Sequence, residues 1–203
     1  MRKEEQTAQA KRKAYTFLFI IGLITIIFVI VLIAMVFRGI KFKSYQDIAK
    51  RGLTITGQEV FKLKDGDYYV FFYSSAKENQ KINYDKQDSL EPYIANYFTF
   101  VKQNKHKQGV CQIRLLDVDN SKNSFCLYTS TTSSAQSWDN FTIDESSLPA
   151  LMYLTVDDAG SGQYRYSYDI YTEESQIKSQ LSNSISSVIT VAYIPPKKEL
   201  ELL

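Results

Sequence analysis

The stretch that decides the fold is DYYVFFYSSAKENQK, residues 67–81. From Tyr68 to Tyr73 every residue is apolar or aromatic, which is typical of a strand that is buried on both faces of a sheet. Small polar residues follow, and then a charged segment that can begin a helix. A buried strand that leads into a helix in this way indicates an α/β fold with a parallel crossover.

Strand and helix patterns alternate on both sides of this segment. Pro92 is expected in the first turn of its helix, where its missing N–H costs little. The order of elements predicts a mixed, twisted sheet with helices on both faces. We expect a short helix at 45–51, a strand at 53–56, a helix at 58–64, the strand at 68–73, a helix at 89–101, a strand at 110–119, a loop at 129–137, a strand at 148–154, a turn at 157–162, a strand at 164–171 and a helix at 173–185.

The N-terminal part of the chain predicts a membrane anchor. No residue from Tyr15 to Phe37 is charged, and most are Ile, Leu, Val or Phe. As a helix this run is about 35 Å long at roughly 1.5 Å per residue, enough to cross a hydrocarbon core of about 30 Å. A cleaved signal peptide would have a shorter apolar core and a small-x-small cleavage site, and the sequence Ala34-Met35-Val36 does not provide one. We therefore expect residues 15–37 to contact membrane lipid.

The charges around the anchor give its expected orientation. Basic residues flank the span on both sides, so the positive-inside rule alone is nearly balanced. The short arm at 1–14 holds its charges close to the membrane, which favours a cytoplasmic N-terminus and an extracytoplasmic domain. Beyond the arm, acidic and basic residues nearly cancel, so no electrostatic footprint for nucleic acid is present.

Four segments follow one another in the chain: LTITGQEVFKLKDGDYYVFFYSS, SLEPYIANYF with an internal proline, CQIRLLDVDN, and SSLPALMYL. Taken in order, these segments resemble the thioredoxin family. The expected fold is therefore a thioredoxin-like mixed sheet flanked by helices and preceded by one transmembrane helix, similar to the membrane-anchored, bacteriocin transport accessory-like proteins of low-GC Gram-positive bacteria. The predicted division is a cytoplasmic arm at 1–14, a transmembrane helix at 15–37, a juxtamembrane segment at 38–52, the thioredoxin-like domain at 53–186, and an extra strand at 187–194 with the C-terminal tail to residue 203.

The resemblance also implies a site. In the family a proline in the cis form lies beside a groove that accepts an extended peptide, and here that proline would be Pro149. The groove would be lined by Ala76, Lys77, Ser147, Leu148 and Pro149. The family's Cys-x-x-Cys would fall near residues 77–80, which are Lys-Glu-Asn-Gln. Without a sulfur nucleophile, thiol–disulfide exchange is excluded at this position.

The two cysteines of the chain, Cys111 and Cys126, leave two interpretations open. They form an extracytoplasmic disulfide, or they are two separate buried thiols. If residues 119–124 form a tight turn, Cys126 faces a residue near Val118 rather than Cys111. No grouping of residues predicts a metal site or a bound cofactor.

The functional prediction is a catalytically inactive, membrane-anchored domain that binds an unidentified membrane or extracytoplasmic protein. Two alternatives stay open: an atypical thiol–disulfide oxidoreductase that uses both cysteines, and an accessory structural subunit of a membrane complex. The tyrosines at 164, 166 and 168 alternate along one strand and so share one face of the sheet. They pack under a helix or form an aromatic contact surface.

Overall fold

The computed structural model describes residues 2–38, 41–64, 66–76, 82–129, 134–160 and 162–191. The chain divides into two compact units, Met1–Ile40 and Lys41–Leu203, and each is described by itself. The helices and strands of the second unit follow in chain order: α2 (Tyr45–Lys50), α3 (Gly57–Val60), β1 (Tyr68–Tyr73), α4 (Tyr84–Asn104), β2 (Gln112–Asp117), η1 (Ser124–Cys126), β3 (Leu127–Tyr128), η2 (Trp138–Asn140), β4 (Ile143–Asp144), η3 (Glu145–Ser147), β5 (Ala150–Gly160), β6 (Gln163–Tyr171) and α5 (Glu174–Val191).

The first unit is one helix, α1 (Arg2–Arg38), which includes the predicted arm as well as the predicted span. Within it, Tyr15–Met35 is long and apolar enough to cross a membrane. The side chains of this segment are exposed in the absence of a membrane. Its length and composition fit a single-pass membrane protein.

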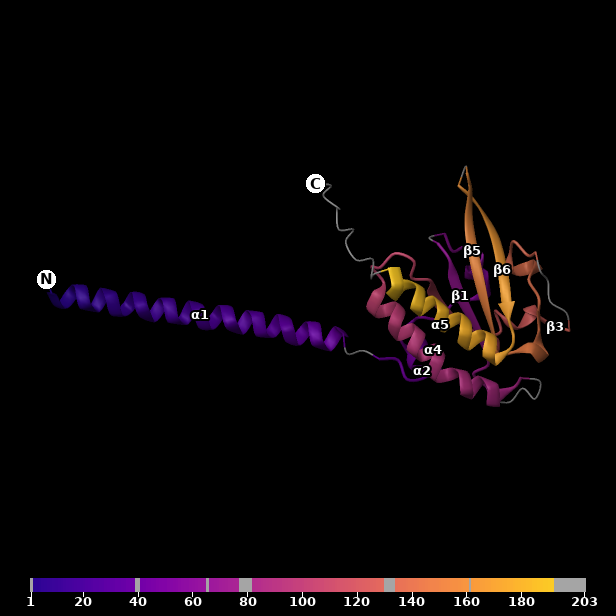
Figure 1. The fold of residues 1–203 in the computed structure, drawn as a ribbon, viewed down its shortest axis with the longest axis horizontal. Coiled ribbons are helices and arrows are strands. Elements are labelled where there is room, and N and C mark those ends of the chain that lie inside the picture. Colours follow the sequence, from indigo (N-terminus) through magenta and orange to yellow (C-terminus); the bar gives the residue numbers. More distant parts are fainter. Residues whose placement is uncertain are drawn as a thin grey trace, which may run out of the picture. The chain divides into compact units, whose positions relative to one another are not determined.

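A four-stranded mixed sheet, in the order β2-β1-β5-β6, forms the centre of the second unit (Figure 1). β1 runs parallel to β2 and antiparallel to β5, and β5 and β6 form an antiparallel hairpin. All six residues of β1 are buried, as the apolar run predicts. The segment at 53–56 contributes only an isolated parallel bridge, between Thr54 and Leu115, where a full strand was expected.

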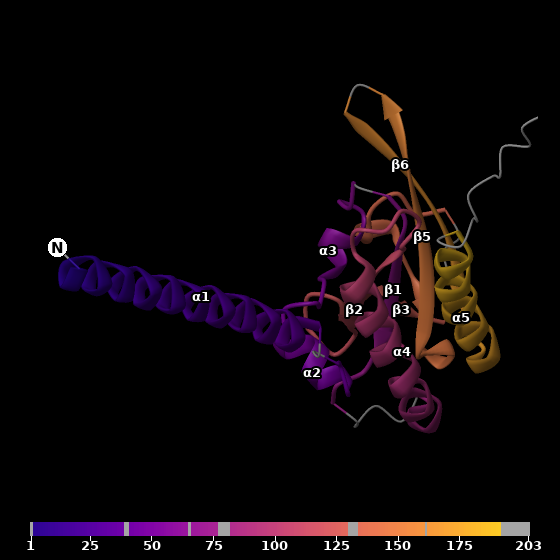
Figure 2. The same ribbon diagram turned by 60° about the vertical axis from the view of Figure 1, so that its left-hand side comes forward.

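The two faces of the sheet are covered differently. Tyr69, Phe71 and Tyr73 of β1 point into a core that they share with α2, α4 and α5, and Figures 1 and 2 show α4 and α5 on the same side of the sheet. The other face packs against short α3, the 3-10 turn η2 and the aromatic residues around them. The expectation of helices on both faces is therefore correct only in part, because no long helix covers this second face among the described residues.

Helix α4 is longer than expected because its N-cap lies upstream of the predicted start. The side chain of Asn83 accepts a hydrogen bond from the Lys86 backbone N–H at 3.0 Å, which begins the helix at Tyr84. The prediction that Pro92 lies in the first turn is wrong, since Pro92 is inside the helix. Its ring there removes one helical hydrogen bond.

The β5–β6 hairpin is also longer than expected. Asp157 pairs with Arg165 and Asp158 with Tyr164, so the turn is confined to the short connection between Gly160 and Gln163. The pairing of β5 with β1 ends at Leu154. The outer part of the hairpin consequently projects beyond the rest of the sheet (Figures 1 and 2).

Tyr164, Tyr166 and Tyr168 share one face of β6, as predicted, and pack into the core opposite α4 and α5. Tyr166 is buried and makes an edge-on contact with Phe61. β6 is the last strand of the sheet, and its backbone is partly covered by a side chain. Gln136 accepts from the Tyr166 backbone N–H at 2.9 Å and donates to the Tyr166 carbonyl at 2.7 Å.

The strand predicted at 187–194 is not present in its described part. Residues 187–191 form the last turns of α5, which ends at Val191. Val188 is buried at this end of the helix, so an apolar residue that suits a strand serves equally well on the covered face of a helix. The rest of the predicted segment, 192–203, lies outside the described residues.

Candidate functional site

The chain leaving β1 is held by two carboxylates at the end of β2. Asp117 accepts hydrogen bonds from the Ser75 backbone N–H at 3.3 Å and from the Ser75 hydroxyl at 2.7 Å. Asp119 accepts from the Ser74 hydroxyl and from the Ala76 backbone N–H, both at 2.7 Å. The aspartates therefore order the junction at residues 74–76. Residues 77–80, where the thioredoxin resemblance expects a dithiol, lie outside the described residues.

Gln87 of α4 binds the backbone of Ser74 in the same junction. Its amide accepts from the Ser74 backbone N–H and donates to the Ser74 carbonyl, each at 2.9 Å. Both residues are buried. Because buried backbone groups must be paired, Gln87 replaces the sheet partners that Ser74 loses when the chain turns away from β1.

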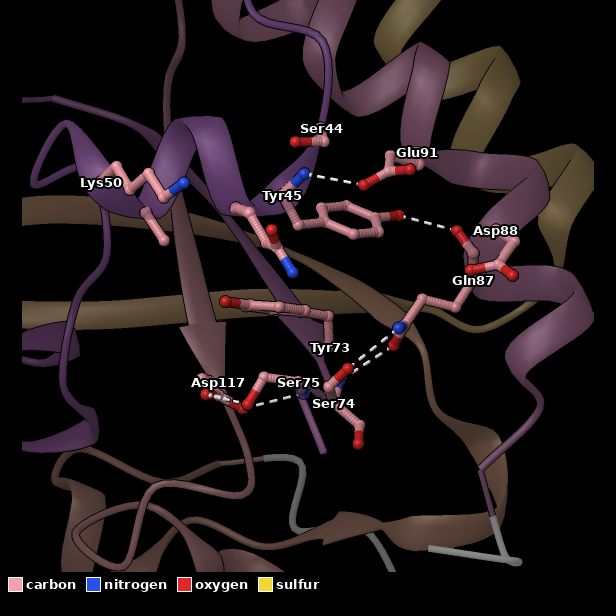
Figure 3. A pocket seen from close by; sticks show the side chains of 12 residues that line it. Ser44, Tyr45, Lys50, Tyr73, Ser74, Ser75, Gln87, Asp88, Glu91 and Asp117 are labelled. Carbon is pink, nitrogen blue, oxygen red and sulfur yellow. Dashed lines mark hydrogen bonds between the residues drawn. The ribbon is translucent and has the colours of Figure 1, made fainter. Parts of the chain in front are cut away.

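A hollow of about 530 Å³ opens beside this junction, between α2, the end of β1 and the first half of α4 (Figure 3). Its wall includes the rings of Tyr45 and Tyr73, which are stacked with their centroids 5.1 Å apart. The Tyr45 hydroxyl donates to the Gln87 carbonyl at 2.8 Å. The hollow is lined by Ser44, Tyr45, Gln46, Ala49, Lys50, Tyr73, Ser74, Ser75, Gln87, Asp88, Glu91 and Asp117.

The hollow has an acidic wall. Asp88 is exposed, while Glu91 and Asp117 are half-buried. Glu91 accepts a hydrogen bond from the Tyr45 backbone N–H at 2.8 Å, which fixes its position. Of the residues that line the hollow, Lys50 alone contributes a positive charge. A cleft lined mainly by one sign of charge favours ligands of the opposite sign.

The two tyrosines in the wall stay neutral at physiological pH. Burial, followed by the nearby charges of Asp117 and Asp119, raises the pKa of Tyr73 to about 12. Burial also raises the pKa of Tyr45, with Glu91 and Asp88 adding to the effect. The carboxylates of Asp88, Glu91 and Asp117 therefore set the class of ligand that the hollow favours, while the two buried rings form part of its wall.

A second hollow of about 360 Å³ lies next to the first, and Ala49, Tyr73 and Asp117 line both. Glu59 contributes a carboxylate to it, and none of the residues lining it is basic. Hydrogen bonds from the Thr56 hydroxyl and backbone N–H lower the pKa of Glu59. We call the two hollows together the acidic groove.

Around Pro149, where the thioredoxin resemblance expects a peptide groove, the described backbone groups of Leu148 are paired within the chain. The Leu148–Pro149 peptide bond is cis, as predicted, but both residues are buried. Within η3 and its flank, the Leu148 backbone N–H donates to the Glu145 carbonyl at 3.2 Å. Its carbonyl accepts a long bond of 3.4 Å from the backbone N–H of Asn83. The Leu148 backbone groups that would bind a peptide are thus already paired within the chain.

The other residues of that predicted groove differ in how far their side chains are exposed to solvent. Ala76 is exposed and Ser147 is half-buried, and Lys77 lies outside the described residues. The Ser147 carbonyl accepts a hydrogen bond from the ammonium group of Lys86 at 2.9 Å. Burial lowers the pKa of Lys86, against the opposing effect of Glu173 and Glu174.

The cysteines do not form a disulfide in the structure. Cys111 packs against the core that contains α4, whereas Cys126 lies in the core on the other face of the sheet. Burial raises the pKa of the Cys126 thiol to about 12 and raises that of Cys111 as well. A reactive thiol needs the opposite shift, so the arrangement supports the interpretation of two separate thiols, with Cys126 buried and Cys111 partly buried.

Sequence reasoning did not identify Tyr45 or Gln87 as site residues. The position of Gln87 could have been recognised from the sequence. Gln87 precedes Leu90 and Ile94 at helical spacing and so occupies a core-facing position of its helix. A polar residue at such a position implies a buried hydrogen-bond partner. Tyr45 had no such signal, since its role depends on packing α2 against α4.

No group of three or more histidine, cysteine, aspartate or glutamate side chains suitable for a metal ion occurs in the part of the chain that the structure describes. Comparisons of the chain with protein-family models, with curated proteins and with solved structures find no match. The site is therefore interpreted from its own geometry.

Proposed function

We propose that this chain is a single-pass membrane protein whose extracytoplasmic, thioredoxin-like domain, which lacks the family's Cys-x-x-Cys, binds a partner protein. The acidic groove is its binding site, and it accepts an extended segment of the partner that carries a lysine or arginine. The observation that carries the proposal is the hollow of about 530 Å³, with stacked tyrosines and carboxylates at the ends of two parallel strands. Ligands of α/β proteins commonly bind at this end of the strands.

The order and direction of the elements support the thioredoxin-like assignment. A parallel pair joined through α4 is followed by a cis-proline, an antiparallel hairpin and a final helix. The bridge at Thr54 supplies a remnant of a fifth strand beside β2. Since a fold does not determine a function, this likeness adds the expectation of a protein ligand and no more.

The shape and lining of the acidic groove favour a polypeptide over a small molecule. Its two hollows share one wall and extend from Glu91 on α4 to Asn123 beyond β2. A small-molecule site is usually a mostly apolar cavity, whereas carboxylates and other polar side chains line this elongated groove beside its aromatic wall. An extended segment can place one cation beside Asp88 and Glu91 and its neighbouring residues along the second hollow.

The test uses the full-length chain in the membranes of its native host. A photo-crosslinking amino acid replaces Gln46, which is exposed and lines the hollow. A control chain carries it at Gln163, which is exposed at the end of the hairpin. We expect one protein adduct from position 46 and none of the same mass from position 163.

A second variant tests the chemistry of the groove. Asp88→Asn with Glu91→Gln removes two negative charges while keeping the size of each side chain. We expect the position 46 adduct to fall at least five-fold, with the amount of chain in the membrane unchanged. An adduct that is equally strong in this variant, or equally strong from position 163, would contradict the proposal.

A further inference from the structure

A second charged region surrounds Phe42, on the opposite half of α4 from the acidic groove. Phe42 is 5 % exposed and packs edge-on against Phe98. The guanidinium of Arg51 lies 5.2 Å from the centre of the Phe42 ring, and the ammonium of Lys102 lies 5.6 Å from it. Phe42 is thus buried beneath cationic side chains.

Hydrogen bonds attach the backbone of Phe42 to α4. The Phe42 backbone N–H donates to the Thr99 hydroxyl at 3.0 Å, and that hydroxyl donates to the Ala95 carbonyl at 2.9 Å. Both Phe42 and Thr99 are buried. The point where the chain enters the domain is therefore fixed on the surface of α4.

Two shallow hollows of about 420 Å³ and about 250 Å³ lie in this region. The first contains Lys41 and Lys43, and the second has an apolar floor that includes Leu53 and Val101. None of the described residues that line either hollow carries a carboxylate. We define the basic face as the cationic residues of both linings: Lys41, Lys43, Arg51, Lys102, Lys105 and Arg114.

The nearest acidic partner in this region neutralises only part of the charge. Asp47 forms an ion pair with Arg51 at 3.2 Å. Lys107 lies two residues after Lys105 at an exposed position, which extends the positive region. The basic face keeps a net positive charge after the one ion pair is counted.

The covalent structure limits how far this face can lie from a bilayer. The apolar span ends at Met35, and the chain from there to Phe42 reaches at most about 25 Å at roughly 3.6 Å per residue. A domain of this size is roughly 40 Å across by the usual scaling of size with length. The covalent link to the anchor therefore keeps Phe42 near the lipid headgroups. Electrostatic attraction then favours the orientation in which a basic surface of the domain faces them.

We propose that the basic face docks on the headgroups of anionic phospholipids beside the chain's own anchor. This inference rests on the membrane anchor of the proposed function and is independent of the acidic groove. Each lysine or arginine near an anionic bilayer increases the binding of a protein surface to that bilayer by about five-fold. Along α4, Asp88 and Lys102 are separated by about 21 Å at 1.5 Å per residue, so the acidic groove and the basic face occupy opposite halves of this helix.

The experiment places the full-length chain in nanodiscs of phosphatidylcholine alone, or with about one-third phosphatidylglycerol. An amine-reactive reagent then modifies accessible lysines, and mass spectrometry gives the rate at each site. We expect Lys102 to react at least three-fold more slowly in the anionic nanodiscs at low salt. The protection should disappear at about 0.5 M salt, where the Debye length is only a few ångströms. Lys122, which follows the C-terminal end of β2 and lies outside the basic face, should react at the same rate in the two kinds of nanodisc.

Two charge-reversal variants separate the basic face from a general effect of charge. Lys105→Glu with Lys107→Glu changes two exposed residues beside the reporter and should abolish the protection of Lys102. Lys64→Glu with Lys122→Glu makes the same change of charge at other exposed positions and should leave it intact. Protection of Lys102 that does not require anionic lipid, or that survives the first variant, would overturn the inference.

A chain that fails to remain in the nanodiscs would overturn both this inference and the anchor, and that outcome is seen before any lysine is measured. Loss of the crosslinked adduct at position 46 with normal protection of Lys102 would instead contradict the acidic groove alone.

Discussion

Replacing Gly57 by alanine should severely disturb the core that faces away from α4. A Cβ atom at Gly57 would lie 1.8 Å from Cε2 of the Trp138 ring and 2.2 Å from Cδ2. Carbon atoms in contact normally lie about 3.5–4.0 Å apart, so the ring must move by roughly 1.5 Å or more. Trp138 is 2 % exposed and stacks on Phe141 with a centroid distance of 5.3 Å, and this contact opposes the movement.

The backbone cannot make the space instead. The Gly57 N–H donates to the buried side chain of Asn123 at 2.8 Å, which holds the start of α3 in place. Overpacking usually costs about 1–3 kcal/mol, and complete loss of a buried aromatic side chain costs about 3–5 kcal/mol. We expect Gly57→Ala to reduce the free energy of unfolding by about 3 kcal/mol, between these two limits.

The assay is urea unfolding of the full chain in neutral detergent micelles. Trp138 is the only tryptophan, so its emission reports both the transition and the displacement of the ring, as a red shift of the native signal. The control is Gly52→Ala, where a Cβ meets nothing within 4 Å but φ is +68°. This variant should cost about 1–2 kcal/mol from backbone strain with unchanged native emission. A loss below about 1 kcal/mol for Gly57→Ala, with native emission, would refute the reasoning.

Three further predictions concern the site and the thiols. Gln87→Leu should lower the free energy of unfolding by about 2–4 kcal/mol in the same assay, because it leaves two buried backbone groups of Ser74 unpaired; a loss under about 0.5 kcal/mol would contradict this. Glu59 has a pKa below its ordinary value of 4.5, so its stabilisation is present above that value and is lost as the pH falls through the lower, folded value. Glu59→Gln should remove this contribution to the pH dependence of the free energy of unfolding. The same loss of stability on acidification in the variant and in the unchanged chain would argue against it. At pH 8 a thiol reagent should modify Cys126 and Cys111 only after unfolding, with no mass change on reduction; fast labelling of the native chain would show that the burial is wrong.

Much of the sheet could be predicted from the sequence because its strands bury their side chains continuously or alternately. β1 is apolar at every position, and such a run allows few alternatives to a central strand. The cis bond at Pro149 was expected from family resemblance, since composition and spacing do not determine a peptide isomer. The start of α4 was missed because Asn83 lies next to residues with no apolar periodicity, and a cap is visible only once the helix is placed.

The site was harder to predict than the fold. The expected groove at Leu148 depended on an analogy and stays a prediction, although the backbone groups of Leu148 are already paired within the chain. The acidic groove combines Tyr45, Tyr73 and Glu91, which are far apart in the sequence and meet only when α2 packs on α4. Pairwise proximity of this kind has no local signal in a single sequence.

The side chain of Gln136 has a consequence for the behaviour of many copies in one bilayer. β6 is an edge strand, and free backbone groups on such an edge can recruit a strand from another molecule. Anchored proteins are confined to a plane, where encounters between neighbouring copies are frequent. By taking both the N–H and the carbonyl of Tyr166, the amide of Gln136 imitates the next strand and ends the sheet there. This pairing therefore opposes edge-to-edge association of neighbouring copies at this position of β6.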